Sequence, residues 1–170
     1  MSQTATSFPF HADLALASED DTRALAKRFA GLLRAGDVLL LEGPIGAGKT
    51  AFARALILAR LAASGLPPED VPSPTFTLVQ TYDVGDTEIW HADLYRLSHS
   101  SEAIELGLED AFASAICLVE WPDRLGGHVP DTALHLNFEP QSSGEARRLR
   151  ISGAEAWAGR LRPVLEARDG

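Results

Sequence analysis

One short glycine-rich segment carries the residue types best suited to chemistry: GPIGAGKT, at positions 43–50. It fits the pattern G-x-x-x-x-G-K-[S/T], in which glycines let the backbone turn several N–H groups toward one bound anion. Lys49 would reach the β- and γ-phosphates of a nucleotide, and the Thr50 hydroxyl would take one coordination position on Mg²⁺. The chain has only two lysines, so a lysine at this position does not reflect composition. The segment predicts a nucleotide phosphate site.

The sequence on either side supplies the elements that would position this segment. The apolar run Val38–Leu41 precedes it and predicts a buried strand. Residues 51–63 follow it, and their apolar side chains recur at three- and four-residue spacing, which indicates a helix. The positive end of that helix's dipole would add to the anion site. A chance glycine-rich turn is the alternative, but chance does not also supply the flanking strand and helix.

Hydrolysis of a bound nucleotide also needs acidic side chains that hold Mg²⁺ and orient water. Glu120 lies at the carboxyl end of an apolar strand predicted at 116–121, where the crevice of an open α/β sheet lies. Asp93 lies near the end of another predicted strand. Either carboxylate would hold the metal while the other would poise the attacking water, and a solvated strand end is the alternative for each. The candidate catalytic residues are therefore Lys49, Asp93 and Glu120, and the candidate metal ligands are Thr50, Asp93 and Glu120.

Two further groups of polar residues are weaker candidates. His91 would hydrogen-bond a phosphate or a water, although a structural role is the more frequent one for a single histidine. Two hydroxyls follow a proline-rich loop and would sense a γ-phosphate as a switch segment does, with a plain strand start as the alternative. The residues of this switch-like segment are Ser73, Pro74, Thr75 and Phe76.

The remaining patterns predict the elements that would surround the site. Further strands are expected at 11–16, 75–84, 87–97, 132–138 and 147–152, the last of them at a sheet edge. Further helices are expected from the cap Ser18 to a stop at Gly36, and at 154–167. We therefore predict an α/β fold: a P-loop NTPase three-layer sandwich with a mostly parallel central sheet and an antiparallel portion. Residues 1–170 would form a single domain, with residues 1–10 as a flexible tail.

The charge and the cysteine content restrict the possible partners and location. The net charge is −9 and the pI is about 4.9, so the chain should not bind nucleic acid by itself; RNA would be held mainly by a partner. The densest basic cluster is Arg147, Arg148 and Arg150, for which we weigh a blunted sheet edge against a contact to a partner or RNA. The single cysteine, Cys117, excludes a disulfide within the chain and fits a cytoplasmic protein. No apolar run approaches membrane-spanning length, and no secretory signal is evident, so we expect no membrane association.

Four further motifs follow the phosphate loop along the chain. They are SPTFTLV (73–79), HADLYRL (91–97), LGLED (106–110) and LVEWPD (118–123). Together with GAGKT and Phe52, this order resembles the TsaE family, also called YjeE, from about Ser18 to Phe138. The combination is far more specific than the phosphate loop alone.

The resemblance implies a function, ligands and partners. TsaE proteins are small bacterial ATPases that act with TsaB and TsaD in making N6-threonylcarbamoyladenosine at position 37 of tRNA. In that family TsaD carries the transfer chemistry, and the nucleotide cycle of TsaE resets the complex between turnovers. The implied ligands are ATP or ADP and Mg²⁺. The implied partner is the TsaB–TsaD complex, with tRNA contacted indirectly through it.

The resemblance also implies roles for individual residues. Gly46 to Thr50 would hold the phosphates, Trp121 would lie beside the nucleotide, and the region around Glu19 and Thr22 would approach its base. The full set of predicted nucleotide-binding residues is Gly43, Ile45, Gly46, Ala47, Gly48, Lys49, Thr50, Ala51, Glu19, Thr22 and Trp121.

Two positions depart from the family pattern. Pro44-Ile45 stands where the family commonly has Asp-Leu, and Ala51 stands where it often has a second threonine. The missing hydroxyl removes one possible contact to phosphate or water. This departure concerns the details of catalysis rather than nucleotide binding.

Other nucleotide-dependent functions remain as alternatives. A guanine-specific GTPase would carry Asn-Lys-x-Asp, but the only asparagine, Asn137, has no lysine beside it. A small-molecule kinase would need an arginine-bearing lid, whereas the region after Glu120 offers only Arg124 before residue 147. A nucleotide-gated binding module with negligible turnover needs the same site as an ATPase. We expect an ATPase with a weak, partner-stimulated rate, because no arginine finger is evident in the sequence.

Overall fold

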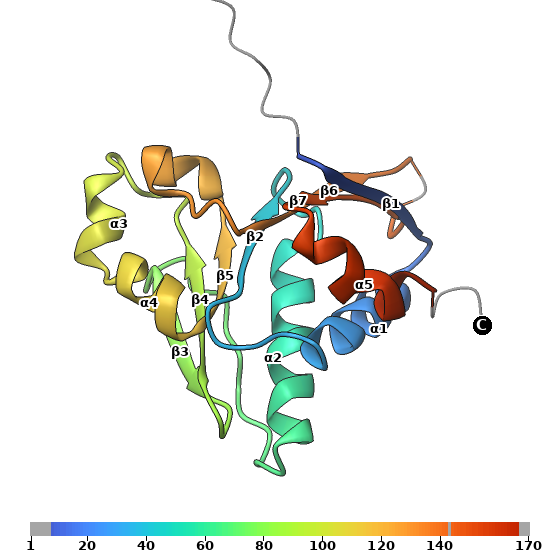
Figure 1. Ribbon diagram of the computed structural model, residues 1–170, viewed down its shortest axis with the longest axis horizontal. Coiled ribbons are helices and arrows are strands. Elements are labelled where there is room, and N and C mark those ends of the chain that lie inside the picture. Colours follow the sequence, from blue (N-terminus) through green and yellow to red (C-terminus); the bar gives the residue numbers. More distant parts are fainter. Residues whose placement is uncertain (1–7, 143, 167–170) are drawn as a thin grey trace, which may run out of the picture.

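The computed structural model describes residues 8–142 and 144–166, which form a seven-stranded sheet with helices on both faces (Figure 1). The strands are β1 (Phe10–Leu16), β2 (Val38–Glu42), β3 (Val79–Asp83), β4 (Glu88–Asp93), β5 (Ile116–Glu120), β6 (Leu134–Pro140) and β7 (Arg147–Gly153). The helices are α1 (Glu19–Ala30), α2 (Lys49–Ala63), α3 (Ser101–Glu105), α4 (Leu108–Ser114), the 3₁₀ helix η1 (Pro122–His128) and α5 (Ala156–Glu166). Within the described ranges, no helix combines the length and the apolar character needed to cross a membrane.

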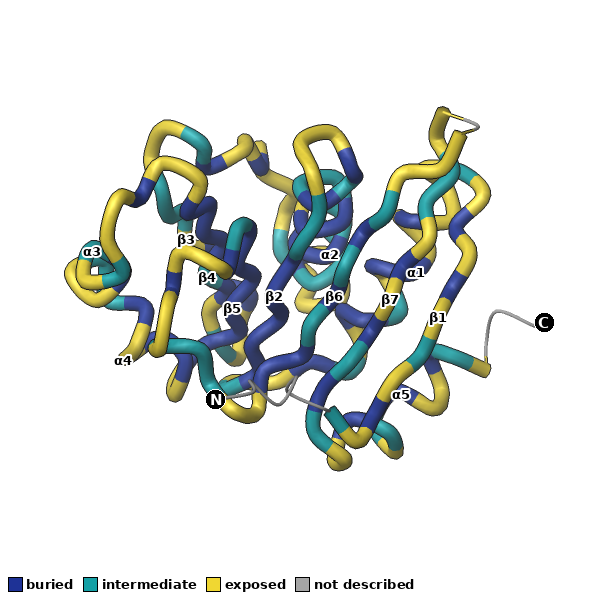
Figure 2. Tube along the Cα trace, turned by 90° about the horizontal axis from the view of Figure 1, so that it is seen from above, coloured by how far each residue is buried: buried dark blue, intermediate teal, exposed yellow. Residues whose placement is uncertain are grey.

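The sheet has a parallel centre with antiparallel flanks, in the order β1-β7-β6-β2-β5-β4-β3. The parallel pairs are β6 with β2, β2 with β5, and β5 with β4. Strand β3 runs antiparallel to β4, and β7 runs antiparallel to both β6 and β1. Strand β5 and most of β2 are buried on both faces, which explains why they appear in the sequence as continuous apolar runs (Figure 2). The predicted α/β class, with its parallel centre and antiparallel portion, is confirmed.

Two hydrophobic cores lie on opposite faces of the sheet. One packs α1, α2 and α5 against it, and there the ring of Phe52 lies 5.6 Å from that of Phe29 and 5.5 Å from that of Phe138, between centroids. The other packs α3, α4 and η1 against β2, β5 and β4 and includes Leu40 and Val119. Strand β2 is therefore fixed from both sides, and so is the start of the loop that leaves it.

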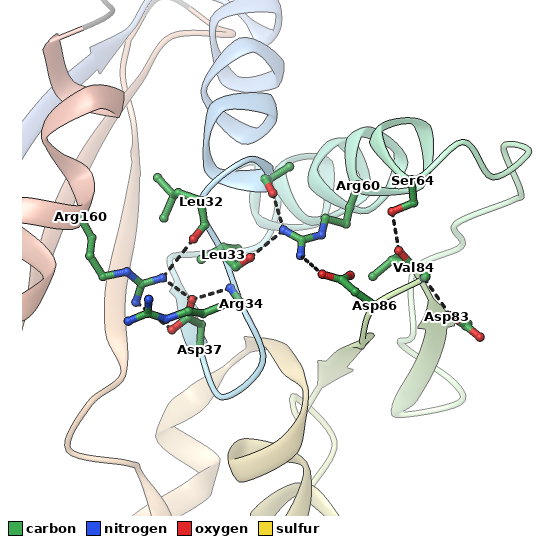
Figure 3. Close-up of polar contacts among 12 residues, drawn as sticks. Leu32, Leu33, Arg34, Asp37, Arg60, Ser64, Asp83, Val84, Asp86 and Arg160 are labelled. Atoms are coloured by element: carbon green, nitrogen blue, oxygen red, sulfur yellow. Dashed lines mark hydrogen bonds and ion pairs between the residues drawn. The ribbon is translucent and has the colours of Figure 1, made fainter.

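Two arginines hold the turn between α1 and β2 against neighbouring helices (Figure 3). Arg60 of α2 donates from Nη1 to the carbonyl oxygens of Ala30 at 2.7 Å and Leu33 at 2.6 Å. Arg160 of α5 forms an ion pair with Asp37, with 2.6 Å between Nη2 and Oδ2. The last carbonyls of a helix have no partner within it, and the contact from Arg60 satisfies that of Ala30. The contacts of Arg60 also fix α2, whose first turn borders the phosphate loop.

The prediction that the strand at 147–152 lies at a sheet edge is wrong. Strand β7 lies between β1 and β6, and the edges are β1 and β3. Its apolar residues are buried while Arg148 and Arg150 are exposed, because none of the described helices covers that face of β7. Arg148 pairs with Asp13 at 3.1 Å, and Arg150 pairs with Glu139 at 3.3 Å. An internal strand with one open face gives the same sequence alternation as an edge strand, so alternation alone could not tell them apart.

The first helix is also shorter than predicted. It ends at Ala30, where an arginine of α2 binds the last carbonyl, whereas Gly36 has φ 95° and turns the chain into β2. At the chain ends, residues 1–7 of the predicted tail and residue 167 of the predicted last helix lie outside the described residues. Phe10, the last residue of that predicted tail, is buried in β1.

The strands predicted at 75–84 and 87–97 are present and pair as an antiparallel hairpin, but both are shorter than the sequence suggested. Strand β3 begins at Val79, because the N–H of Leu78 donates to the carbonyl of Pro74 at 2.7 Å and closes a turn. Leu78 itself has φ 69°, which extended backbone does not allow. Strand β4 ends at Asp93 rather than Leu97. These shorter strands leave the switch-like segment free of the sheet and beside the site.

Candidate nucleotide site

A cleft of about 430 Å³ lies where the carboxyl ends of β2, β4 and β5 meet the start of α2. This is the crevice in which open α/β sheets bind ligands. The predicted site residues that line it are Glu19, Ile45, Gly46, Gly48, Lys49, Thr50, Ala51, Thr75, Asp93, Glu120 and Trp121. The phosphate-loop motif and two acids from distant parts of the sequence thus share one cavity.

The phosphate loop has the backbone that its glycines predict. Gly43, Gly46 and Gly48 have φ values of 139°, 81° and 107°, which side chains disfavour. A Cβ on Gly43 would also come 2.5 Å from the carbonyl oxygen of Phe138, so only glycine fits where the loop passes β6. Gly48 caps α2 without a side-chain hydrogen bond, which leaves the N–H groups of the first turn available to an anion.

Three predicted nucleotide-binding residues do not reach the cleft lining. Gly43 lies against β6, as described, and Ala47 is fully buried in the core. Thr22 is buried in α1, and its hydroxyl donates to the carbonyl of Ser18 at 3.5 Å. Of the α1 positions that we predicted, only Glu19 borders the site.

Lys49 is held inside the loop by two contacts. Its ammonium donates from Nζ to the carbonyl oxygen of Gly43 at 2.5 Å and lies 3.6 Å from the ring centroid of Trp121. The indole reaches this position because Trp121 has φ 59°, an unfavourable backbone conformation for a non-glycine residue. Burial lowers the pKa of Lys49, and the carboxylates of Glu120 and Asp93 partly oppose that shift. A bound phosphate would add negative charge and favour the ammonium form.

Glu120 joins the end of β5 to the start of α2. The Thr50 hydroxyl lies 2.9 Å from Oε1 and 3.0 Å from Oε2 of Glu120, although the two residues are 70 positions apart. His91 of β4 lies 2.7 Å from Oε2 through its Nε2, and both side chains are buried. His91 therefore orients Glu120 instead of lining the cleft, which favours the structural role for this histidine. Its Nδ1 has no hydrogen-bond partner among the described residues.

Asp93 is the neighbour of Glu120 across the sheet but has different partners. The two residues pair in register between β4 and β5. Asp93 accepts from the backbone N–H of Tyr95 at 3.0 Å and from the hydroxyl of Thr75 at 3.3 Å. The Thr75 hydroxyl is in turn 2.7 Å from that of Ser73. Asp93 thus connects the cleft to the switch-like segment.

The remaining switch-like residues lie outside the cleft lining. Ser73 and Pro74 precede Thr75, and the ring of Phe76 is 80% exposed with the Arg96 guanidinium 4.5 Å from its centroid. The structure therefore brings only one residue of the segment, Thr75, into the cleft.

The oxygen donors at the cleft suit a magnesium ion. A hydroxyl and two carboxylates, from Thr50, Glu120 and Asp93, offer hard oxygen ligands beside the phosphate loop. The described residues contain no group of three or more histidine, cysteine or acidic side chains arranged to hold a metal by themselves. Mg²⁺ commonly takes one or two protein ligands and completes its shell with phosphate oxygens and water. The residues present therefore fit this ion together with a nucleotide.

Two cleft residues were missed as site residues in the sequence. The ring centroid of Tyr95 lies 4.8 Å from that of Trp121, with the two planes tilted by 52°, and its place two residues after Asp93 was the available signal. Arg147, noted only as part of a basic cluster, lines the cleft from β7. No local pattern could have placed it there, because it is 100 residues from the loop that it contacts.

The comparisons with known proteins agree on one family. The family model for the threonylcarbamoyl adenosine biosynthesis protein TsaE matches residues 16–149. A tRNA threonylcarbamoyladenosine biosynthesis protein TsaE from Rickettsia bellii is 37% identical over 124 residues, which cover 73% of this chain and 83% of that protein. The protein of the same name from Bacillus subtilis is 39% identical over 119 residues, covering 69% and 70%. The crystal structure of Bacillus subtilis YdiB superimposes with a TM-score of 0.74 at 26% identity, covering 95% of this chain and 97% of that one. The chain belongs to the TsaE family of tRNA threonylcarbamoyladenosine biosynthesis proteins.

Proposed function

We propose that this protein is a Mg²⁺-dependent ATPase that supports N6-threonylcarbamoyladenosine modification at tRNA position 37. Its ATP cycle would reset a complex formed with TsaB and TsaD. One observation carries the catalytic part of the proposal: Thr50, next to the phosphate-loop lysine, is hydrogen-bonded to both carboxylate oxygens of Glu120 at 2.9 and 3.0 Å. This contact joins the element that would bind phosphate to an acid from a separate strand.

Each cleft residue has a role that its contacts support. The Lys49 ammonium and the free N–H groups of the first turn of α2 would bind the phosphates. Thr50 and Glu120 would hold the metal, and His91 would keep the Glu120 carboxylate in place. Asp93, whose carboxylate faces the same cleft, would orient the attacking water. Bound Mg²⁺ would neutralise the charge that develops on the phosphate oxygens.

Two features support a slow enzyme that works with a protein partner. The arginine on the cleft lining, Arg147, is hydrogen-bonded to backbone carbonyls, so it is not free to act as an arginine finger. At the phosphate loop, Ile45 is 76% exposed, and in the switch-like segment Phe76 is 80% exposed. Apolar side chains this exposed are suited to burial against another protein.

The decisive experiment measures phosphate release from ATP by the protein alone, and then with TsaB, TsaD and tRNA added. We expect slow Mg²⁺-dependent release that the partners stimulate, with no phosphorylated acceptor. The matched control replaces ATP by GTP, for which the sequence offers no guanine-specific segment.

The alternatives give different outcomes in the same assay. A phosphorylated small molecule would identify a kinase and contradict the proposal. Tight ADP binding without turnover, even in the presence of the partners, would leave a nucleotide-gated binding module. Absence of any nucleotide binding would refute the assignment of the cleft itself.

A further inference from the structure

Arg147 is the only arginine on the lining of the described cleft, and its guanidinium is bound by the backbone. Nε donates to the carbonyl oxygen of Ala47 at 2.7 Å, and Nη2 donates to that of Gly46 at 3.0 Å. Nη1 donates to the carbonyls of Gly144 at 2.5 Å and Ala146 at 2.9 Å. One planar side chain therefore joins the phosphate loop to the turn before β7.

These contacts fix the direction of peptide groups inside the phosphate loop. In a planar trans peptide, the carbonyl of one residue and the N–H of the next point in opposite directions. Because Arg147 holds the carbonyl of Ala47, the N–H of Gly48 is turned away from the guanidinium. A loop that binds phosphate needs its carbonyl oxygens kept off the anion, since they would repel it. The guanidinium satisfies two such oxygens at once.

A second contact from the same turn supports this arrangement. The carboxylate of Glu145 accepts from the backbone N–H of Glu19 at 3.2 Å, and Glu19 opens α1 on the lining of the cleft. The turn before β7 and the first residue of β7 therefore approach the cleft at two places, through Glu145 and through Arg147. Its neighbour Arg148 makes no such contact and pairs with Asp13 on β1.

We propose that Arg147 is a positioning residue that sets the phosphate loop in the conformation that binds the β-phosphate of a nucleoside diphosphate. The inference rests on the proposed nucleotide function and adds to it a residue from the start of β7. The role requires the planar fork of arginine, because a lysine ammonium keeps the charge but cannot bridge both loop carbonyls in this geometry.

The test compares nucleotide affinities by calorimetry with Mg²⁺ present. ADP and AMP are titrated into the wild type, Arg147→Ala, Arg147→Lys and the control Arg148→Ala. We expect Arg147→Ala to weaken ADP binding by roughly 10- to 100-fold, since charged hydrogen bonds to two loop carbonyls are lost. Arg147→Lys should restore less than about a third of the lost ADP affinity, measured on a logarithmic scale of Kd. AMP has no β-phosphate, so its affinity should change less than about threefold, and Arg148→Ala should bind ADP like the wild type.

These results decide between a positioning role for Arg147 and a role that needs only its positive charge. Equal ADP affinity in Arg147→Ala and Arg148→Ala would overturn the positioning role. Wild-type ADP affinity in Arg147→Lys would also overturn it, because the positive charge alone would then be sufficient. If Arg147→Ala does not fold, Arg147→Lys decides: wild-type ADP affinity in that variant overturns the inference, and selective loss of ADP over AMP supports it. If the wild type itself does not bind ADP, the proposed function fails first, and the inference fails with it.

Discussion

The two acids of the cleft lie at equivalent positions on adjacent strands but contact different parts of the molecule. Glu120 and Asp93 are register partners at the ends of adjacent parallel strands, and both are buried. Glu120 contacts Thr50 at the start of α2 and the buried His91. Asp93 contacts Thr75 of the switch-like segment, where the ring of Phe76 is exposed to solvent.

Position on the sheet therefore does not by itself assign a role to a carboxylate. The Glu120 side of the cleft is built from elements packed on both faces by the two cores, so its geometry is set before a ligand arrives. The side of the cleft around Asp93 depends on the switch-like segment, which lies outside the sheet. We expect substitutions on the Glu120 side to affect binding and chemistry strongly, and those on the Asp93 side to have smaller effects.

The largest effect is expected for Lys49→Ala on the Glu120 side. Loss of the buried ammonium should weaken ATP and ADP binding by at least about 100-fold, because charged hydrogen bonds to phosphate are lost. Calorimetric titration with Mg²⁺ measures this directly. The control is Lys27→Ala, which removes the only other lysine, an exposed residue of α1. Unchanged affinity in Lys49→Ala would refute the phosphate-loop assignment.

Glu120→Gln should separate turnover from binding. The amide keeps the size of the carboxylate but removes the charge that would hold Mg²⁺, so steady-state phosphate release should fall by roughly 100-fold or more. ADP affinity should stay within about threefold of the wild type, because the phosphate loop is intact. Glu109→Gln, at an exposed glutamate paired with His128, controls for loss of one charge. Full activity in Glu120→Gln would remove this residue from the mechanism.

Asp93→Asn should have a smaller effect and so tests the comparison itself. The asparagine Oδ1 can still accept from the Tyr95 N–H, and its amide Nδ2 can donate to the Thr75 hydroxyl in place of the second carboxylate oxygen, so the segment should stay in place. The lost charge should reduce turnover by about tenfold, which corresponds to roughly 1.4 kcal/mol of barrier. The measurement is the ratio of the Asp93→Asn and Glu120→Gln rates under one Mg²⁺ concentration. Equal losses would show that the two sides do not differ in the way their contacts suggest.

The mildest substitution, Ser73→Cys, compares the reactivity of a thiol in the exposed switch-like segment with that of Cys117 in the core. Burial raises the pKa of the Cys117 thiol to about 12, so at pH 8 it should not react with a disulfide reagent. Ser73→Cys adds a thiol to the exposed segment, and we expect it to react at least about 100-fold faster than Cys117. Absorbance of the released aromatic thiol measures both rates. A reactive Cys117 in the folded wild type would contradict the described core.

The same thiol predicts how stability depends on pH. In the unfolded chain the thiol loses its proton near its ordinary pKa of 9.0, while in the folded protein it keeps the proton to about 12. Between these values the folded state binds more protons, so the contribution of Cys117 to stability falls as the pH rises. Urea unfolding of the wild type and Cys117→Ala across this range should give curves that converge with increasing pH.

Local sequence patterns were enough to predict the chemical groups of the site and most of the elements that carry them. The glycine-rich loop, its flanking strand and helix, and both acids could be predicted, because each depends on local spacing or on the end of an apolar run. The fold class followed from the same runs, since strands buried on both faces are continuously apolar. The helix end at Ala30, the start of β3 and the internal position of the strand at 147–152 could not be predicted correctly.

Which of these groups contact one another depends on the three-dimensional fold. Three contacts join residues from distant parts of the chain: the hydrogen bond from Thr50 to Glu120, the contact of His91 with Glu120, and the hydrogen bonds from Arg147 to the phosphate loop. Such contacts depend on strand order and on where the turn before β7 lies relative to α2. Neither is encoded in local periodicity, which reports only whether a residue is buried and in what kind of element.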